Sequence, residues 1–362
     1  MDFDVASEHV LLRDSLRRTL ASTDSGGAWT RCVELGLAGL DCRESAPTTD
    51  DALAMTVVQE ELGRALLPVP FVTSVVEAGA LARVGGHGMV SDVEAGRIVA
   101  TADDVGRGRY GFDGEPVRAV ASGDGWRLDG KRALVPFADC ADAIVLPART
   151  RNDGALTLFV VRASAHGVGV ARVARLDGHP AGDLDLNGVV VPDTARLGAI
   201  DGGRPLLEGV RRMAIVALVA EAVGCMDALL ALTLDYLRTR QQFGRPLAAF
   251  QALRHRAADM YVAVEQARSM MLYAALTASD PDPDARVRAV AAAKVQAGRA
   301  ARFVGQQAIQ LHGGIGLADE HRAGHYLQRL TAIELAFGDA DDHLTALGER
   351  GGLYAPADPV GR

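Results

Sequence analysis

The spacing of apolar residues changes twice along this chain of 362 residues, and the change limits the folds that the chain can adopt. Up to about residue 95, apolar residues recur every three or four positions, as at Leu12, Leu16 and Leu20. Side chains with this spacing share one face of a helix. Between about residues 96 and 198 short β-branched and aliphatic runs replace the pattern, and from Arg204 the helical spacing returns. The sequence therefore predicts an α+β fold that is mainly α.

The middle segment is predicted to be a small antiparallel sheet. Its apolar runs, at residues 143–146, 156–161 and 189–191, have the length and composition of strands. Turn-forming residues separate these runs, namely Gly123-Asp124-Gly125, Asp129-Gly130 and Asn152-Asp153-Gly154.

The last part of the chain carries long helical patterns. The first would be roughly 55 Å long at 1.5 Å per residue, which suits a four-helix bundle. Pro281 and Pro283 break the pattern between the second and third helices. The four patterns cover residues 204–241, 246–279, 284–312 and 321–349. We therefore expect an N-terminal helical domain at residues 1–95, a middle antiparallel β domain at 96–200 and a C-terminal four-helix bundle at 201–362.

Composition excludes several functional classes. A hydrophobic content of 49% suits a globular protein, and a net charge of −8 offers no basic surface to nucleic acid. We find no apolar run near the roughly 20 residues that cross a bilayer, and the acidic N-terminus is unlike a signal peptide, so we expect a cytoplasmic protein. No metal site is expected, and the scattered cysteines are predicted to be buried thiols. These cysteines are Cys32, Cys42, Cys140 and Cys225.

Two short runs in the last third of the chain suggest a large phosphate-bearing cofactor. The Arg240 guanidinium can bind two phosphate oxygens through parallel hydrogen bonds, and Gly244 is expected to stop the preceding helix. Gly313 and Gly314 can bring backbone N–H groups close to an anion, while Gln310 adds an amide. From spacing alone, two ordinary helix ends with glycine caps are an equally good interpretation. The runs are Arg240-Gln241-Gln242-Phe243-Gly244 and Gln310-Leu311-His312-Gly313-Gly314-Ile315-Gly316.

These runs, together with Gln251, His255 and Glu320, resemble the C-terminal half of the acyl-CoA dehydrogenase family. A weaker similarity extends upstream, to residues 57–70 and to Leu128-Asp129-Gly130-Lys131. The resemblance implies FAD as cofactor and an acyl-CoA or acyl-carrier thioester as substrate. It also implies that one set of residues serves the ADP portion of an FAD held mainly by the neighbouring subunit: Arg240, Gln242, Phe243, Gln251, Gln310, Gly313 and Gly314.

The family's catalytic base is missing from its expected positions. In the family a carboxylate removes the α-proton of the thioester while the flavin accepts the β-hydride. The usual glutamate position falls on Phe337, and an alternative position falls on residues 213–215, which include no carboxylate. Asp339 could substitute as the base, since related nitroalkane-oxidising flavoenzymes use an aspartate in this region. An N-terminal cap for the last helix is the favoured interpretation of Asp339.

The middle segment also differs from the family at positions that serve the subunit's own active site. Where the family carries Trp-x-Thr beside the flavin ring, this chain has Ala133 and Val135. Alanine lacks the stacking face, and valine lacks the hydroxyl. The family's Thr-Glu-Pro…Gly-Ser-Asp segment is replaced by residues 102–108. The chain's own flavin-ring pocket is therefore expected to be altered.

The ADP-side residues are thus retained, while the ring pocket and the base are changed. The leading hypothesis is a subunit of a heteromeric acyl-CoA dehydrogenase, resembling paired actinobacterial enzymes that act on steroid side-chain thioesters, with electron-transfer flavoprotein or another acceptor. A second hypothesis is a self-sufficient homo-oligomeric flavoenzyme, dehydrogenase or oxidase, with Asp339 as base. A third is a non-catalytic scaffold subunit.

Overall fold

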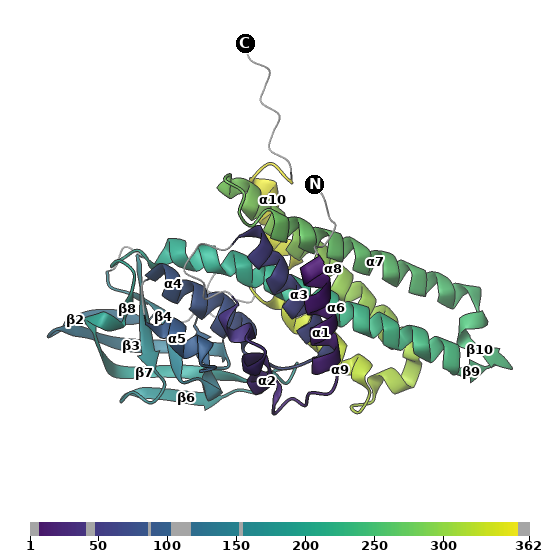
Figure 1. Cartoon of the computed structure of the whole chain (residues 1–362), viewed down its shortest axis with the longest axis horizontal. Coiled ribbons are helices and arrows are strands. Elements are labelled where there is room, and N and C mark those ends of the chain that lie inside the picture. Colours follow the sequence, from purple (N-terminus) through teal and green to yellow (C-terminus); the bar gives the residue numbers. More distant parts are fainter. Residues whose placement is uncertain (1–6, 41–47, 86–87, 103–116, 152–154, 354–362) are drawn as a thin grey trace, which may run out of the picture. The chain divides into compact units, whose positions relative to one another are not determined.

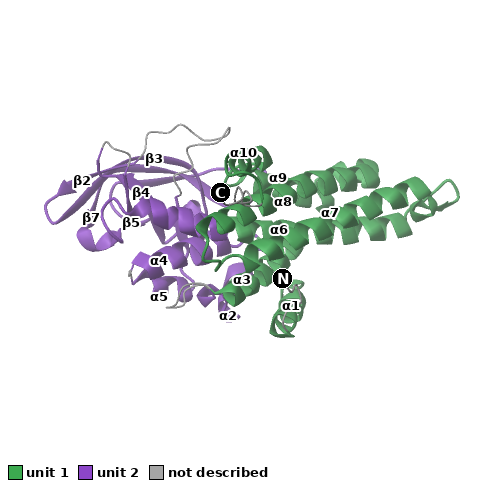
Figure 2. Ribbon diagram, turned by 90° about the horizontal axis from the view of Figure 1, so that it is seen from above, with its two compact units in different colours: residues 1–22, 48–67, 215–362 green, residues 23–47, 68–214 purple. Residues whose placement is uncertain are grey.

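The computed structural model describes residues 7–40, 48–85, 88–102, 117–151 and 155–353 (Figure 1). The chain divides into two compact units (Figure 2). Unit 1 comprises residues 1–22, 48–67 and 215–362, and unit 2 comprises residues 23–47 and 68–214. Each unit takes helices from the segment predicted as the N-terminal domain, and the division into three domains stays a prediction.

Unit 2 is built on an eight-stranded sheet with the order β6-β7-β3-β2-β4-β5-β8, in which β1 pairs with β4. The expected β runs are confirmed as β4, β5 and β7. The sheet is mixed rather than purely antiparallel, because β1 and β2 both pair with β4 in parallel. Its strands are β1 (Val99–Thr101), β2 (Arg118–Ser122), β3 (Gly125–Pro136), β4 (Ala143–Arg149), β5 (Leu156–Arg162), β6 (Val168–Arg172), β7 (Ala181–Pro192) and β8 (Arg196–Leu197).

One of the predicted turns is wrong. The turn at Gly123-Asp124 closes the β2–β3 hairpin as expected. Asp129-Gly130 instead lies inside β3, where the register against β7 shifts between Leu128 and Gly130. Gly130 has φ +142°, and a Cβ there would lie 2.9 Å from the Val117 Cα, so this glycine allows a bulge with close backbone approach. The third predicted turn, at residues 152–154, lies outside the described residues.

Short helices accompany the sheet in unit 2, and the first residues of α6 (Gly203–Thr239) also belong to it. They include the nine-residue π-helical segment η2, whose Ser74 hydroxyl donates to the Val99 carbonyl of β1 at 3.0 Å. The short helices are α2 (Ala28–Glu34), η1 (Leu37–Gly39), η2 (Phe71–Gly79), α4 (Ala80–Gly85), α5 (Met89–Glu94), η3 (Ala138–Cys140) and η4 (Asp193–Ala195).

Unit 1 is helical, and its long helices confirm most of the predicted patterns. The fourth pattern is wrong in one respect, because residues 321–349 form two helices. Helix α9 ends at Leu335, its C-cap Ala336 is extended, and Phe337 and Gly338 follow with φ +58° and +95°. The helices are α1 (Ser7–Leu20), α3 (Thr49–Ala65), α6 from residue 215, α7 (Gln251–Leu276), α8 (Pro283–His312), α9 (Arg322–Leu335) and α10 (Ala340–Glu349).

Two further expectations need correction. Helix α6 is long and apolar enough to cross a membrane, contrary to the sequence survey, but 78% of its most apolar window is buried inside the protein. The apolar residues of this helix therefore belong to the core, and the cytoplasmic location stays a prediction.

Cys32 and Cys225 are buried thiols as expected, whereas Cys140, the last residue of the short turn η3, is exposed. Cys42 lies outside the described residues.

Helices α3 and α6 cross at two glycines. A Cβ on Gly63 would lie 2.2 Å from the Glu221 carbonyl oxygen, and one on Gly224 would lie 1.8 Å from the Glu60 carbonyl oxygen. Real Cβ atoms do not approach this closely, so the contact of the two backbones depends on the absence of side chains here. The Cys225 thiol donates to the Gly63 carbonyl at 3.2 Å across the same crossing.

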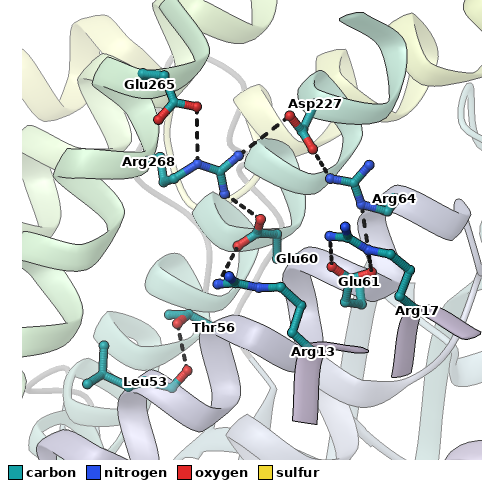
Figure 3. Close-up of polar contacts among 10 residues, drawn as sticks. All are labelled: Arg13, Arg17, Leu53, Thr56, Glu60, Glu61, Arg64, Asp227, Glu265 and Arg268. Atoms are coloured by element: carbon teal, nitrogen blue, oxygen red, sulfur yellow. Dashed lines mark hydrogen bonds and ion pairs between the residues drawn. The ribbon is translucent and has the colours of Figure 1, made fainter. Parts of the chain in front are cut away.

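Charged residues of α3 pair with α1, α6 and α7 beside this crossing (Figure 3). Glu61, 1% exposed, accepts two hydrogen bonds from Arg17 at 2.7 and 3.1 Å, and Glu60, 2% exposed, pairs with Arg268. Burying such charges is tolerated only with close partners. Four arginines meet four carboxylates, so the formal charges of the cluster balance. Its members are Arg13, Arg17, Glu60, Glu61, Arg64, Asp227, Glu265 and Arg268.

Candidate functional site

Arg240 lies directly after the end of α6. Its N–H still donates to the Tyr236 carbonyl at 2.9 Å, and its carbonyl accepts from Leu247 N–H at 2.9 Å, so its backbone is fixed on both sides. Its side chain is exposed and has no hydrogen-bond or ion-pair partner among the described residues. A guanidinium held by a rigid backbone with all donors available is suited to binding a phosphate group.

The residues after Arg240 form a tight hairpin of β9 (Gln241–Gln242) and β10 (Arg245–Pro246). Gly244 was predicted to stop a helix, but it lies at the hairpin tip, and α6 ends earlier, at Thr239. Phe243 and Gly244 have φ +55° and +76°, the pattern of a two-residue hairpin turn whose twist matches its strands. For Phe243 this left-handed conformation is strained. The hairpin also moves the start of α7 to Gln251, five residues after the predicted position.

Phe243 is the most exposed large apolar residue of the described chain, at 88% exposure. Its ring meets the Phe250 ring edge-on at 6.0 Å, and the Arg245 guanidinium lies 4.2 Å from the same Phe250 ring. A strained, exposed phenyl ring on a rigid hairpin is costly for an isolated subunit. The arrangement is suited to packing against a cofactor or a second chain.

Gly313 ends α8 and opens the short 3₁₀ helix η6 (Gly313–Leu317). It has φ +65°, so the expected glycine cap is present. The chain offers open space there, since a Cβ on either Gly313 or Gly314 would meet no atom within 4 Å. Both glycines are exposed. The glycine-cap interpretation and the anion-binding interpretation are therefore compatible at this turn.

An aromatic contact brings the two runs together. The His312 ring stacks on the Tyr236 ring at 4.7 Å, which joins the end of α8 to the last turn of α6, one turn before Arg240. His312 is 3% exposed, and its Nδ1 donates to the Ala308 carbonyl at 2.9 Å. Burial lowers the pKa of His312, so the ring is neutral at pH 7. No group of three possible metal ligands occurs in the described part of the chain.

The remaining ADP-side residues also face solvent. Gln251, the first residue of α7, and Gln310, in the last turn of α8, are both exposed. Gln251 contacts His255 at 3.4 Å within its own helix. Gln242 is exposed and donates to the Gln241 carbonyl at 2.9 Å. All seven predicted residues thus lie on exposed parts of unit 1, and their guanidinium, amide and glycine-turn chemistry fits the ADP half of FAD.

The turn between α9 and α10 holds the expected base position. Phe337 is half-buried, and its carbonyl accepts from His343 Nε2 at 3.0 Å. Asp339 is the N-cap of α10: its Oδ1 accepts from the N–H groups of Asp341 and Asp342, each at 2.9 Å. The Asp339 N–H in turn donates to the Asp342 carboxylate at 3.2 Å, which completes a capping box. These contacts support the capping role that the sequence favoured.

Replacement of Asp339 distinguishes a cap from a base. Asparagine caps helices about as well as aspartate, so Asp339→Asn is expected to leave stability nearly unchanged. Asp339→Ala is expected to lower the free energy of unfolding by about 1 kcal/mol. Chemical denaturation measures both effects, with Asp341→Asn as the matched control. Loss of turnover in Asp339→Asn with unchanged stability would show instead that this carboxylate is the base.

The positions expected beside the flavin ring lie in unit 2. Ala133 is exposed on β3, and Val135 is 3% exposed within the sheet core. Neither offers a stacking face or a hydroxyl. The replaced segment at residues 102–108 lies outside the described residues except for Ala102. The alternative base position, at residues 213–215, lies on α6, where Ala214 and Ile215 are buried.

Comparisons with known proteins identify the family of this chain. Residues 210–352 match the model of the acyl-CoA dehydrogenase C-terminal domain. Acyl-CoA dehydrogenase FadE27 of Mycobacterium tuberculosis is 32% identical over 334 residues, covering 88% of this chain and 86% of the relative. The crystal structure of the ChsE4-ChsE5 complex from the same organism superposes with a TM-score of 0.83 at 30% identity, covering 99% of this chain and 100% of the matched one. A steroid acyl-CoA dehydrogenase, Tcur3481-Tcur3483, superposes with a TM-score of 0.78 at 30% identity, covering 94% and 97%. The chain belongs to the acyl-CoA dehydrogenase family.

Proposed function

We propose that this chain is a subunit of a heteromeric, FAD-dependent acyl-CoA dehydrogenase and lends its ADP-binding surface to a partner's active site. One contrast carries the proposal. The residues that would hold the ADP portion are present, exposed and held by a rigid backbone, whereas the base position holds Phe337 and the ring positions hold Ala133 and Val135. A subunit that serves only the partner's flavin needs the first set and not the second.

The residues of this chain have distinct tasks under the proposal. Arg240 would hold the pyrophosphate through its paired N–H donors, and the open glycine turn at Gly313 and Gly314 would leave room for the nucleotide. Phe243 covers an apolar face of the nucleotide end and excludes water from the phosphate contacts. Bound FAD would supply the acceptor for the hydride that leaves the β-carbon of the thioester. The α-proton passes to a carboxylate of the partner, because a phenyl ring at Phe337 cannot accept it.

The names of similar proteins support a proposal for the substrate class. Both solved structures at 30% identity are assemblies of two named chains, and one is called a steroid enzyme. These names support a bulky acyl thioester such as a steroid-derived acyl-CoA, and electron-transfer flavoprotein is the expected acceptor. The alternative in which Asp339 is the base receives less support, because the Asp339 carboxylate already accepts two backbone hydrogen bonds.

Flavin content tests the proposal. The chain should be purified alone and after co-expression with a family member that carries glutamate at the base position. Visible flavin absorbance is expected to be small for the chain alone and stoichiometric for the complex. Glutamate→Gln in the partner should abolish turnover while keeping the flavin. A chain that is fully yellow and active by itself would contradict the proposal.

A further inference from the structure

The sequence contains two lysines, Lys131 and Lys294, among 38 Lys and Arg residues. Lys131 is exposed and pairs with Asp185 at 2.9 Å. Lys294 lies on α8 and is only 2% exposed. Lysine is almost never buried so completely unless its charge or its hydrogen bonds have a defined use. In a chain that otherwise relies on arginine, Lys294 therefore requires a specific explanation.

The Lys294 ammonium group binds the end of α9. Its Nζ donates to the Ile333 carbonyl and, at 3.1 Å, to the Glu334 carbonyl. These carbonyls belong to the last turn of the helix, where backbone acceptors lack partners from a following helical turn. The compact amine at the tip of a flexible stem reaches both oxygens, a geometry that a planar guanidinium does not match.

The same face of α8 lies against the turn that follows α9. Gly298 lies one helical turn after Lys294, and a Cβ there would lie 3.3 Å from the Glu334 Cγ and 3.5 Å from the Ala340 Cβ. The end of α9 and the start of α10 therefore both rest on α8 at this point. Ala336 N–H bonds back to the Ala332 and Ile333 carbonyls at 3.2 and 3.3 Å, so the turn starts from the atoms that Lys294 holds.

We propose that Lys294 is a positioning residue that fixes the α9–α10 turn, and with it Phe337 and Asp339, against α8. It acts through backbone carbonyls. The inference goes beyond the proposed function and does not depend on the partner, because Lys294 acts at the base position and not on the residues of the ADP side. In this chain it sets where the Phe337 ring lies; in the alternative mechanism it would set where the Asp339 carboxylate lies.

The charge state of Lys294 makes this role measurable. Burial lowers the pKa of Lys294 to about 7, against the attraction of the Glu334 and Asp339 carboxylates. Arg302 of α8 pairs with Glu334 and offsets part of that attraction. The two hydrogens of the neutral amine suffice for the two carbonyls.

The sign of the pH dependence follows from the lowered pKa. If opening of the turn hydrates Lys294, the amine returns to its ordinary pKa of 10.5, so protonation favours the open state. The equilibrium constant for opening should then be constant below pH 7. Between pH 7 and 10.5 it should fall by up to about tenfold per pH unit, as one proton is released on closing.

Two measurements on the whole chain test the inference. Lysine labelled with ¹³C at Cε gives an NMR signal for each lysine, and Lys131→Met assigns them. Lys294 is expected to titrate near pH 7. Hydrogen exchange at residues 336–342, corrected for intrinsic rates, should slow with rising pH above 7.

Lys294→Met keeps the length of the side chain but removes both hydrogen bonds. It is expected to speed exchange in the turn by roughly tenfold or more at pH 9 and to abolish the pH dependence. The control Lys131→Met should change neither the exchange rate of the turn nor its pH dependence.

Titration of Lys294 above pH 10, or unchanged exchange of the turn in Lys294→Met, would overturn the inference. If Lys294→Met does not fold, the pH series on the unmodified chain decides the question. Corrected exchange that is flat from pH 7 to 9 would then reject the role of Lys294.

Discussion

Arg240→Ala is expected to lower the FAD affinity of the assembled enzyme by about 10- to 100-fold, because charge-assisted hydrogen bonds contribute roughly 1.5–3 kcal/mol. The Arg240 backbone is held by Tyr236 and Leu247, and its side chain has no partner within the described chain. The substitution therefore removes phosphate binding without breaking a contact inside the subunit. Flavin retained after dialysis, and titration of the apo-complex with FAD, measure the loss.

Two variants control this prediction. Arg238→Ala removes another exposed arginine two residues earlier and should leave flavin affinity nearly unchanged. Arg240→Lys keeps the charge but not the paired donors, so it should recover only part of the affinity. Equal flavin content in Arg240→Ala and Arg238→Ala, with full activity of the complex, would favour the scaffold hypothesis.

Gly224→Ala is expected to lower the free energy of unfolding by about 3 kcal/mol or more, the upper range for overpacked cores. The added Cβ would lie 1.8 Å from the Glu60 carbonyl oxygen and 3.0 Å from the Arg64 backbone nitrogen. Both neighbours are backbone atoms of α3, so no side chain can move aside. Helices α3 and α6 would have to separate, which would also strain the ion pairs of Glu60 and Glu61. Urea denaturation followed by circular dichroism measures the effect.

Gly209→Ala is the matched control, because Gly209 lies on the same helix and its added Cβ would meet only the Arg212 Nη2 at 3.9 Å. Replacing glycine by alanine inside a helix stabilises it by roughly 0.5–1 kcal/mol when space allows. Gly209→Ala should therefore be as stable as the unmodified chain or more stable. Equal stability of the two alanine variants would show that the close α3–α6 crossing is not a feature of the folded protein.

Periodicity predicted the element types well because it reflects which faces are buried. It indicated α6, α8 and the strands β4, β5 and β7, since these lie in cores whose apolar spacing is regular. It missed the break between α9 and α10 because the break starts at Ala336, which has no helix-stopping signal, and continues through Phe337, a residue type that seldom has a positive φ. The bulge at Gly130 was taken for a turn for a related reason, since Asp-Gly is compatible with either structure.

Contacts between distant parts of the sequence could not be predicted from local pattern. No residue near Lys294 in the sequence indicates that its amino group donates hydrogen bonds to carbonyls 39 and 40 residues away. The stacking of Tyr236 on His312, which brings the two motifs together, is equally non-local. The motifs did predict the glycine cap at Gly313, because a cap depends on residue type and backbone freedom, while the ADP-binding role of their residues stays a prediction.

A structure of the flavin-loaded assembly, determined by cryo-electron microscopy, tests the central claim most directly. The pyrophosphate should lie within hydrogen-bond distance of Arg240, with the nucleotide end beside Gly313 and Gly314. The flavin ring of the same FAD should lie in a different chain that carries the catalytic glutamate. An FAD bound entirely within one chain, or an Arg240 remote from every subunit boundary, would contradict the account.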